Sequence, residues 1–104
     1  MVDGQRFDSQ REASRWSELR LLERAGTIRN LRRQVTFTLH AGTAEPARAV
    51  VGTYVADFTY EERSTSAARG WIDVIEDCKG MRTALYVWKK KHLFAEYGVR
   101  IIET

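Results

Sequence analysis

The strongest constraint on the fold is a change of hydrophobic period along the chain. In residues 30–40, Leu31, Val35 and Phe37 share one side of an alternating pattern, which predicts a strand. Ser9 and Glu12 have the spacing of a helix N-terminal capping box, and the residues after them carry apolar side chains at helical spacing. The predicted order is a helix (9–26), three strands (30–40, 50–62 and 71–79), a second helix (83–98) and a short last strand (99–103).

This order predicts an α/β domain with an α-β-β-β-α-β core, in which a mixed four-stranded sheet is flanked by helices. The 104 residues are enough for one domain, 1–104, in which residues 1–8 form a flexible N-terminal segment. No apolar run is long enough to span a membrane, and the polar N-terminus does not resemble a secretory signal. The single cysteine fits a reducing, intracellular setting.

Charged residues in two of the predicted strands indicate a reactive site. Asp77 and Lys79 are two positions apart, so in a strand they point to the same side. Asp57 lies between apolar neighbours in residues 50–62, where an unpaired carboxylate is costly. If the register brings the two aspartates together, Mg²⁺ is the natural cation, with the lysine beside it. The sequence does not determine this register, and an exposed ion pair at a strand end is the alternative.

With these residues and this order of elements, the chain resembles the PD-(D/E)XK nuclease superfamily. The order of elements, with acids in the second and third strands followed by D-C-K, is similar to the restriction-endonuclease-like core of that superfamily. RFDSQREASRWSELRLLERAGTIRNL, YVADFTY and VIEDCKGMRT more closely resemble a phage-encoded branch similar to phage Holliday-junction-resolving endonucleases. The resemblance covers roughly residues 6–102, and Ala56 stands where the name of the motif has proline.

The resemblance implies a role for each residue that matches the motif. Asp57 and Asp77 would be ligands of Mg²⁺, for which Mn²⁺ substitutes, and the main-chain carbonyl of Cys78 would complete the site. Lys79 would help to activate water, and Glu12 would join the site from the first helix. The Cys78 thiol is expected to pack on the opposite side and to take no part in the chemistry.

Glu12 and Gln34 each have a second interpretation. Glu12 can instead serve the capping box with Ser9. Gln34 faces away from the apolar side of its strand, as either a polar site residue or an ordinary exposed position. Trp16 and Trp88 lie among apolar neighbours at helical spacing, which predicts core positions for both.

The charge distribution favours a polyanionic partner. Residues 11–33 carry seven arginines and three glutamates (+4), residues 34–78 carry three arginines and seven acids (−4), and residues 79–100 carry six basic residues and one glutamate (+5). Basic segments of this kind suit the phosphate backbone of nucleic acid, although solvated helix faces have the same composition. The candidate DNA-contacting residues are Arg11, Arg15, Gln34, Arg82, Lys89 and Lys90.

Together these features predict a magnesium-dependent DNA endonuclease that acts on branched DNA. Symmetric cutting of a junction needs two active sites, so we expect a homodimer. The resemblance implies action in the cytoplasm of the bacterial host of a phage. We expect no membrane partner and no nucleotide cofactor, since the chain has no nucleotide-binding loop motif. The alternatives are a monomeric nuclease for flaps, nicks or single strands, and a non-catalytic DNA- or protein-binding module on the same fold.

Overall fold

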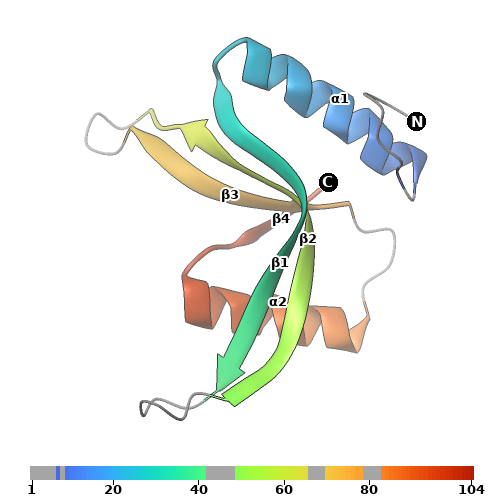
Figure 1. Cartoon of the computed structure of the whole chain (residues 1–104), viewed down its shortest axis with the longest axis vertical. Helices are drawn as coiled ribbons and strands as arrows, with labels where there is room; N and C mark the ends of the chain where they lie inside the picture. Colours follow the sequence, from blue (N-terminus) through green and yellow to red (C-terminus); the bar gives the residue numbers. More distant parts are fainter. Residues whose placement is uncertain (1–6, 8, 42–48, 66–69, 79–82) are drawn as a thin grey trace.

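The computed structural model describes residues 7, 9–41, 49–65, 70–78 and 83–104, and its six elements follow the predicted order (Figure 1). Of the segment 1–8, for which the sequence predicts flexibility, only Phe7 belongs to the described residues. The elements are α1 (Gln10–Arg24), β1 (Ile28–Ala41), β2 (Ala49–Arg63), β3 (Trp71–Asp77), α2 (Ala84–Tyr97) and β4 (Ile101–Glu103).

The four strands form one mixed sheet in the order β1-β2-β3-β4. β2 pairs with β1 and β3 in antiparallel fashion, whereas β3 and β4 are parallel. A parallel pair requires a crossover connection, and α2 provides it. Figure 1 shows α1 beside the upper part of the long β1–β2 hairpin and α2 beside its lower part. The predicted α/β class with a mixed four-stranded sheet and flanking helices is confirmed.

Each helix has its own apolar core. The α1 cluster consists of Trp16, Leu19, Ile28, Phe58, Tyr60 and Val74. The α2 cluster consists of Leu39, Tyr54, Ala56, Ile75, Tyr86, Leu93 and Ile101. Two residues of the twisted strand β2, Ala56 and Phe58, therefore belong to different clusters. Asp57 lies between these two residues in the sequence and belongs to neither cluster.

The helix ends confirm the predicted start at Ser9 and the predicted range 83–98 of the second helix. The Ser9 hydroxyl accepts a hydrogen bond from the Glu12 N–H at 3.1 Å, and the Thr83 hydroxyl accepts one from the Tyr86 N–H at 3.1 Å. Gly98 ends α2 with φ +72°, a left-handed conformation that favours glycine. These local signals determine where the helices begin and end.

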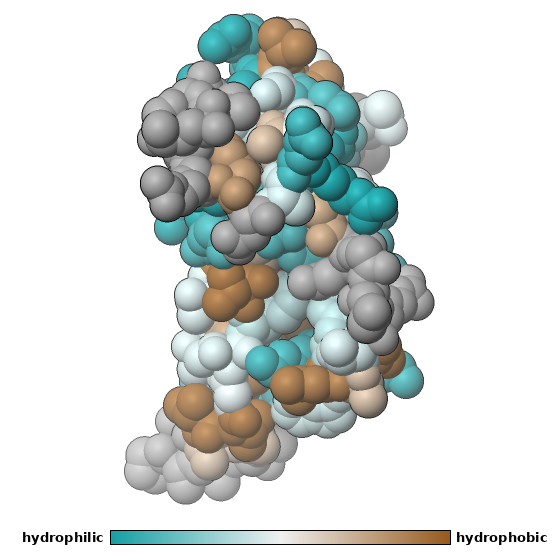
Figure 2. Space-filling model, turned by 90° about the vertical axis from the view of Figure 1, so that its right-hand side faces the viewer, coloured by the Kyte–Doolittle hydropathy of each residue, from teal (hydrophilic) through white to brown (hydrophobic). Residues whose placement is uncertain are grey.

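Two details differ from the sequence-based expectation. β3 ends at Asp77, so Cys78 already lies outside the strand. Trp16 is buried as predicted, but Trp88 is 46% exposed, because it faces outward from α2. Its ring centroid lies 5.2 Å from that of His92 on the same helix. Figure 2 shows apolar patches interrupting the surface of the lower half, whereas hydrophilic side chains dominate the upper half near α1. Among the described residues, no helix is long and apolar enough to cross a membrane.

Candidate active site

Asp57 and Asp77 lie side by side where β2 and β3 come to the end of their pairing. The antiparallel register includes Phe58 opposite Glu76, and the next step along both strands brings Asp57 opposite Asp77. The Asp57 N–H donates to Oδ1 of Asp77 at 3.1 Å, and the Cys78 N–H donates to Oδ2 of Asp57 at 2.8 Å. Asp77 is fully buried and Asp57 is half-buried. The register thus brings together the two acids that the sequence singles out.

Glu12 approaches the same place from α1. Its backbone N–H caps the helix on Ser9, while its carboxylate turns toward β1. Oε1 of Glu12 accepts hydrogen bonds from Nε2 of Gln34 at 3.0 Å and from the Arg33 guanidinium at 3.4 Å. The structure shows the Ser9 half of the capping box, which uses the Glu12 backbone, whereas the Glu12 carboxylate contacts Gln34 and Arg33.

Gln34 connects the acid of α1 to the acid of β2. Its amide nitrogen donates to Glu12 at 3.0 Å and, at a longer distance of 3.5 Å, to Oδ1 of Asp57. The residue has φ +54° within β1, a conformation that is uncommon for any residue except glycine. Gln34 is exposed, as an ordinary strand position would be, and its amide also lies against both acids, as a polar site residue would.

The carboxylates are close enough to influence one another. Burial raises the pKa of Glu12, and the negative charge of Asp57 raises it further. Arg33 and the Gln34 amide act in the opposite direction but do not offset these effects. A cation between such acids would relieve both the burial cost and the repulsion.

Cys78 contributes its backbone rather than its thiol. Sγ lies 3.4 Å from Oγ1 of Thr104 and packs against the α1 cluster, as expected for a side chain on the opposite face. Burial raises the pKa of the thiol, with a smaller contribution in the same direction from the Asp57 charge. A raised pKa disfavours the reactive thiolate at neutral pH.

Glu76, the neighbour of Asp77, faces a different set of partners. Both its carboxylate oxygens accept hydrogen bonds from Arg15 at 2.8 Å, and the Tyr60 hydroxyl donates to the same carboxylate. The hydrogen bond to Glu76 raises the pKa of Arg15, while burial, followed by the same carboxylate, raises the pKa of Tyr60. Arg15 is expected from sequence to contact DNA, but the structure turns its guanidinium inward, because a fully buried carboxylate needs a partner.

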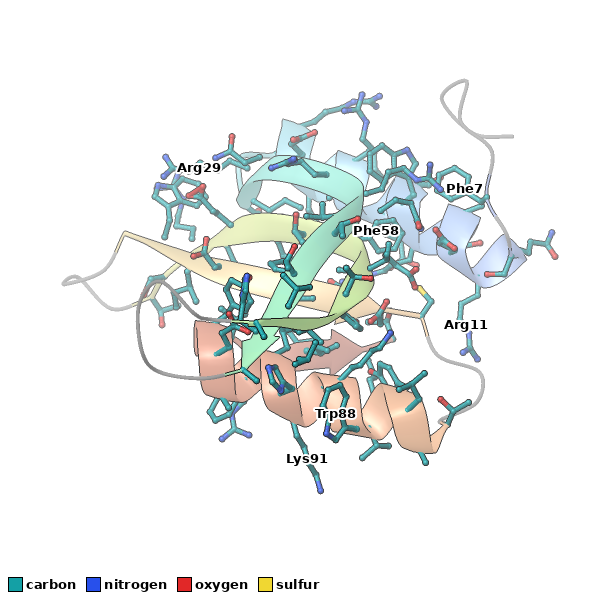
Figure 3. The ribbon with its side chains drawn as sticks, turned by 60° about the horizontal axis from the view of Figure 1, so that its bottom comes forward. Phe7, Arg11, Arg29, Phe58, Trp88 and Lys91 are labelled. Carbon is teal, nitrogen blue, oxygen red and sulfur yellow. The ribbon has the colours of Figure 1, made fainter. Side chains whose placement is uncertain are left out.

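The other predicted DNA-contacting residues are distributed over both helices. Arg11 is exposed, and Figure 3 shows it projecting away from α1. Lys89 is half-buried on α2, and Nζ of Lys90 lies 3.3 Å from a Glu103 carboxylate oxygen. Lys79 and Arg82, the predicted catalytic lysine and a predicted phosphate contact, lie outside the described residues.

Comparison with known proteins identifies a family. The family model described as "Protein of unknown function (DUF1064)" matches residues 1–101. The chain belongs to this family. No curated protein and no solved structure matches the chain. The family description states no activity, and the donor atoms of the site indicate which chemistry it can support.

The donor atoms of the site suit a hard cation. The three acids, Glu12, Asp57 and Asp77, offer only carboxylate oxygens, which Mg²⁺ and Mn²⁺ prefer, whereas zinc sites usually include histidine or cysteine. Within the described ranges, no group of three or more His, Cys, Asp or Glu side chains is placed to hold a metal ion. Mg²⁺ commonly uses only one or two carboxylates and completes its shell with water and substrate phosphate. The aspartate pair fits that requirement.

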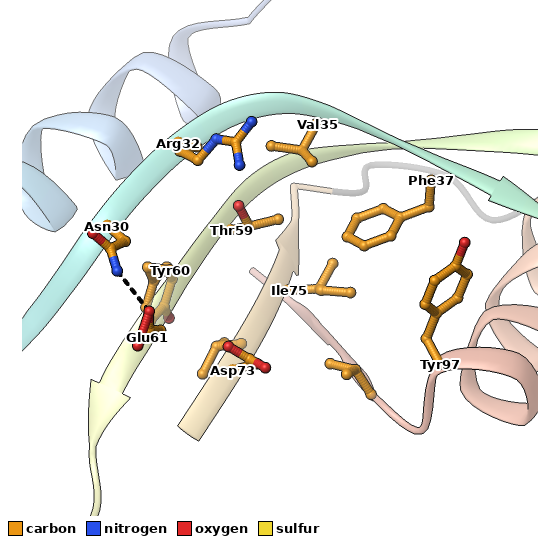
Figure 4. Close-up of a pocket in the computed structure, with 12 residues that line it drawn as sticks. Asn30, Arg32, Val35, Phe37, Thr59, Tyr60, Glu61, Asp73, Ile75 and Tyr97 are labelled. Atoms are coloured by element: carbon orange, nitrogen blue, oxygen red, sulfur yellow. Dashed lines mark hydrogen bonds between the residues drawn. The ribbon is translucent and has the colours of Figure 1, made fainter. Parts of the chain in front are cut away.

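A hollow elsewhere on the sheet has a different chemistry. It has a volume of about 630 Å³ and none of the predicted site residues lines it (Figure 4). Its apolar wall includes Phe37 and Ile75, and its polar rim includes Glu61, which accepts a hydrogen bond from Asn30 at 2.6 Å. None of Glu12, Asp57 and Asp77 lines this hollow, so it is separate from the candidate site.

Sequence analysis misses two partners of the acids, Arg33 and Tyr60. Arg33 lies next to Gln34, but alternation predicts that the two side chains diverge, whereas both reach Glu12. The positive φ of Gln34 explains this, because it interrupts the regular alternation of the strand. Tyr60 is identified from the alternating pattern only as an apolar-face residue, and nothing in the sequence pairs its hydroxyl with Glu76.

Proposed function

We propose that the protein is a metal-dependent DNA endonuclease of the PD-(D/E)XK type that cuts branched DNA in the manner of a Holliday-junction resolvase. One observation carries the proposal: Glu12, Asp57 and Asp77 lie together although three different elements, α1, β2 and β3, contribute them. Glu12 and Asp77 are buried, and the charge of the half-buried Asp57 acts on Glu12. Acids buried beside another acid are a poor way to stabilise a fold and are typical of functional sites.

Asp57, Asp77 and the main-chain carbonyl of Cys78 would hold Mg²⁺, with Mn²⁺ as a substitute. Such an ion supplies positive charge opposite a scissile phosphate and acidifies water. Glu12 would orient that water and accept its proton, because a carboxylate with a raised pKa is a better base near neutral pH. Lys79 would help to activate the water and stabilise the negative charge that develops on the phosphate.

Basic residues of both helices would bind the DNA backbone without reading its sequence. The candidates are Arg11 and Lys89, with Lys90 also held by Glu103 and Arg82 next to the site in sequence. Because one chain supplies one such site, symmetric cleavage of a junction requires a homodimer. This homodimer would act in the cytoplasm of the bacterial host. Arg15 is left out of this surface, since its guanidinium is engaged by Glu76.

The decisive experiment is a cleavage assay with four-way junction, flap, linear duplex and single-stranded DNA in the presence of Mg²⁺ or Mn²⁺. We expect Asp77→Asn and Asp57→Asn each to lower the cleavage rate by about a hundredfold or more. Losing a metal ligand should cost more activity than losing a residue that only hydrogen-bonds to a ligand. Asp73→Asn is the matched control, because Asp73 is an exposed acid of the same strand.

Each outcome separates the proposal from its alternatives. Full activity of Asp77→Asn would refute the site. Preferential cutting of flaps or single strands by a monomer would support the monomeric nuclease and refute the junction specificity. Metal-independent DNA binding without cleavage of any substrate would support a non-catalytic binding module instead.

A further inference from the structure

Gln34 is the most strained residue of the candidate site. It has φ +54° in the middle of β1. This value lies in the left-handed region, where glycine is favoured and residues with a side chain are uncommon. Its side chain is exposed, so packing of an apolar group does not hold it there. A conformation of this kind persists only when other interactions compensate for it.

A comparison within the same strand shows that regular β structure does not account for this conformation. Asn30 also has a positive φ, +55°, but it lies at a register shift between Arg29 and Arg32, where a bulge requires an unusual backbone. The register with β2 is the same on either side of Gln34, with Arg33 opposite Phe58 and Val35 opposite Ala56, although Gln34 itself has no partner residue in that register. The bulge therefore explains Asn30 and leaves Gln34 unexplained.

The side-chain amide offers the missing explanation. Its nitrogen lies 3.0 Å from Oε1 of Glu12 and 3.5 Å from Oδ1 of Asp57, so it donates to both acids at once. The N–H groups of an amide carry partial positive charge, and two neighbouring carboxylates repel one another. The amide therefore does in part what a cation between these acids would do.

We propose that the Gln34 amide stands in for the positive charge of a metal ion at Asp57, holding Glu12 and Asp57 together until a divalent cation binds Asp57 and displaces the amide. This inference rests on the proposed function, because it assumes that the acids bind a cation. It makes Gln34 a positioning residue that competes with the metal, and the strained backbone is what directs its amide toward both carboxylates.

The first test is a titration of the full chain with Mn²⁺, in which isothermal titration calorimetry measures the affinity. Gln34→Gly removes the amide and relaxes the backbone at a positive φ, so we expect the variant to bind Mn²⁺ about tenfold more tightly than the original chain. Asn30→Gly is the matched control. It relaxes the same φ and removes an amide that donates to Glu61 at 2.6 Å, but it lies away from Glu12 and should leave the affinity unchanged.

A second readout needs no metal. If the Gln34 amide holds two repelling acids together, Gln34→Gly should reduce the free energy of unfolding more in the original chain than in a Glu12→Gln background. Asn30→Gly should have the same effect in both backgrounds. Urea denaturation in the presence of a chelator measures all of these variants under one condition.

The outcomes distinguish this inference from the function on which it rests. Clear Mn²⁺ binding by the original chain with unchanged affinity in Gln34→Gly, or additive effects of Gln34→Gly and Glu12→Gln on stability, would overturn the stand-in role alone. Absence of Mn²⁺ binding by both chains at millimolar concentration would overturn the proposed function and the stand-in role together.

Discussion

Glu12 is an acid that the fold buries even though burial makes its ionised form costly. Only 4% of the residue is exposed, and its pKa is raised first by burial and then by Asp57. A surface glutamate at a helix N-terminus would cap the helix as well and would avoid this cost. A costly acid next to other acids is the pattern expected of a residue kept for function rather than for stability.

This burial predicts how stability depends on pH. A folded-state pKa above the unfolded value means that the Glu12 contribution is complete at low pH and is lost as pH rises through the folded pKa. Glu12→Gln, which cannot ionise, should therefore melt a few degrees higher than the original chain at pH 7, and the difference should vanish at about pH 4. Thermal melts by circular dichroism across this range, without divalent metal, measure the effect.

The control is Glu62→Gln, which removes an exposed acid of β2. Its melting temperature should stay close to that of the original chain at both pH values, because exposed substitutions rarely change stability much. A Glu12→Gln variant that is less stable than the original chain at pH 7 would show that ionised Glu12 contributes to the fold.

At the scale of elements, one buried ion pair ties α1 to β3. Arg15 binds both oxygens of Glu76, and Tyr60 of β2 donates to the same carboxylate, so three elements meet at a single side chain. Glu76 immediately precedes Asp77. The ion pair therefore holds the end of β3 that carries Asp77. The Asp77 side chain points to the opposite side of the strand from Glu76.

Arg15→Met should lower the free energy of unfolding by about 3 kcal/mol, because it leaves the Glu76 carboxylate buried without its charged partner. Glu76→Gln added to Arg15→Met should recover part of this loss, since no buried charge remains. Urea denaturation measures both variants. Arg24→Met, an exposed arginine in the last turn of α1, is the control and should change stability little. An Arg15→Met variant as stable as the control would contradict the importance of the ion pair.

At the scale of the whole molecule, the fold rearranges the charge blocks of the sequence. Several arginines of the basic N-terminal segment are turned toward acids, as Arg15 is toward Glu76 and Arg29 toward Glu61. Exposed basic side chains remain on both helices, for example Arg11 and Lys91, and Figure 3 shows both projecting away from the ribbon. The surface available to a DNA backbone is thus smaller than composition alone indicates.

The proposed function also predicts the assembly state. Symmetric cutting of a four-way junction needs two copies of the site formed by Glu12, Asp57 and Asp77. Multi-angle light scattering at working concentration should therefore give twice the chain mass of 12.0 kDa. Addition of junction DNA in low salt should preserve this stoichiometry, and rising salt should weaken the complex. A purely monomeric chain, free and on DNA, would contradict the junction-resolving role.

The sequence by itself determined the order of the elements, the helix caps at Ser9, Thr83 and Gly98, and the acids worth testing. These features depend on hydrophobic period and on contacts within a few residues, so local physical chemistry is sufficient to predict them. Its core assignment succeeded for Trp16 and was wrong for Trp88, because helical spacing alone does not decide which side of a helix meets the sheet.

Only the tertiary structure decided which residues meet. Arg15 and Glu76 are 61 positions apart, and Asp57 reaches Asp77 only in one of several registers that the pattern permits. The positive φ of Gln34, which points its amide at two acids, has no signature in the alternation of β1. Long-range pairing depends on the packing of whole elements against one another, and so the candidate site took its shape from the fold rather than from any single stretch of sequence.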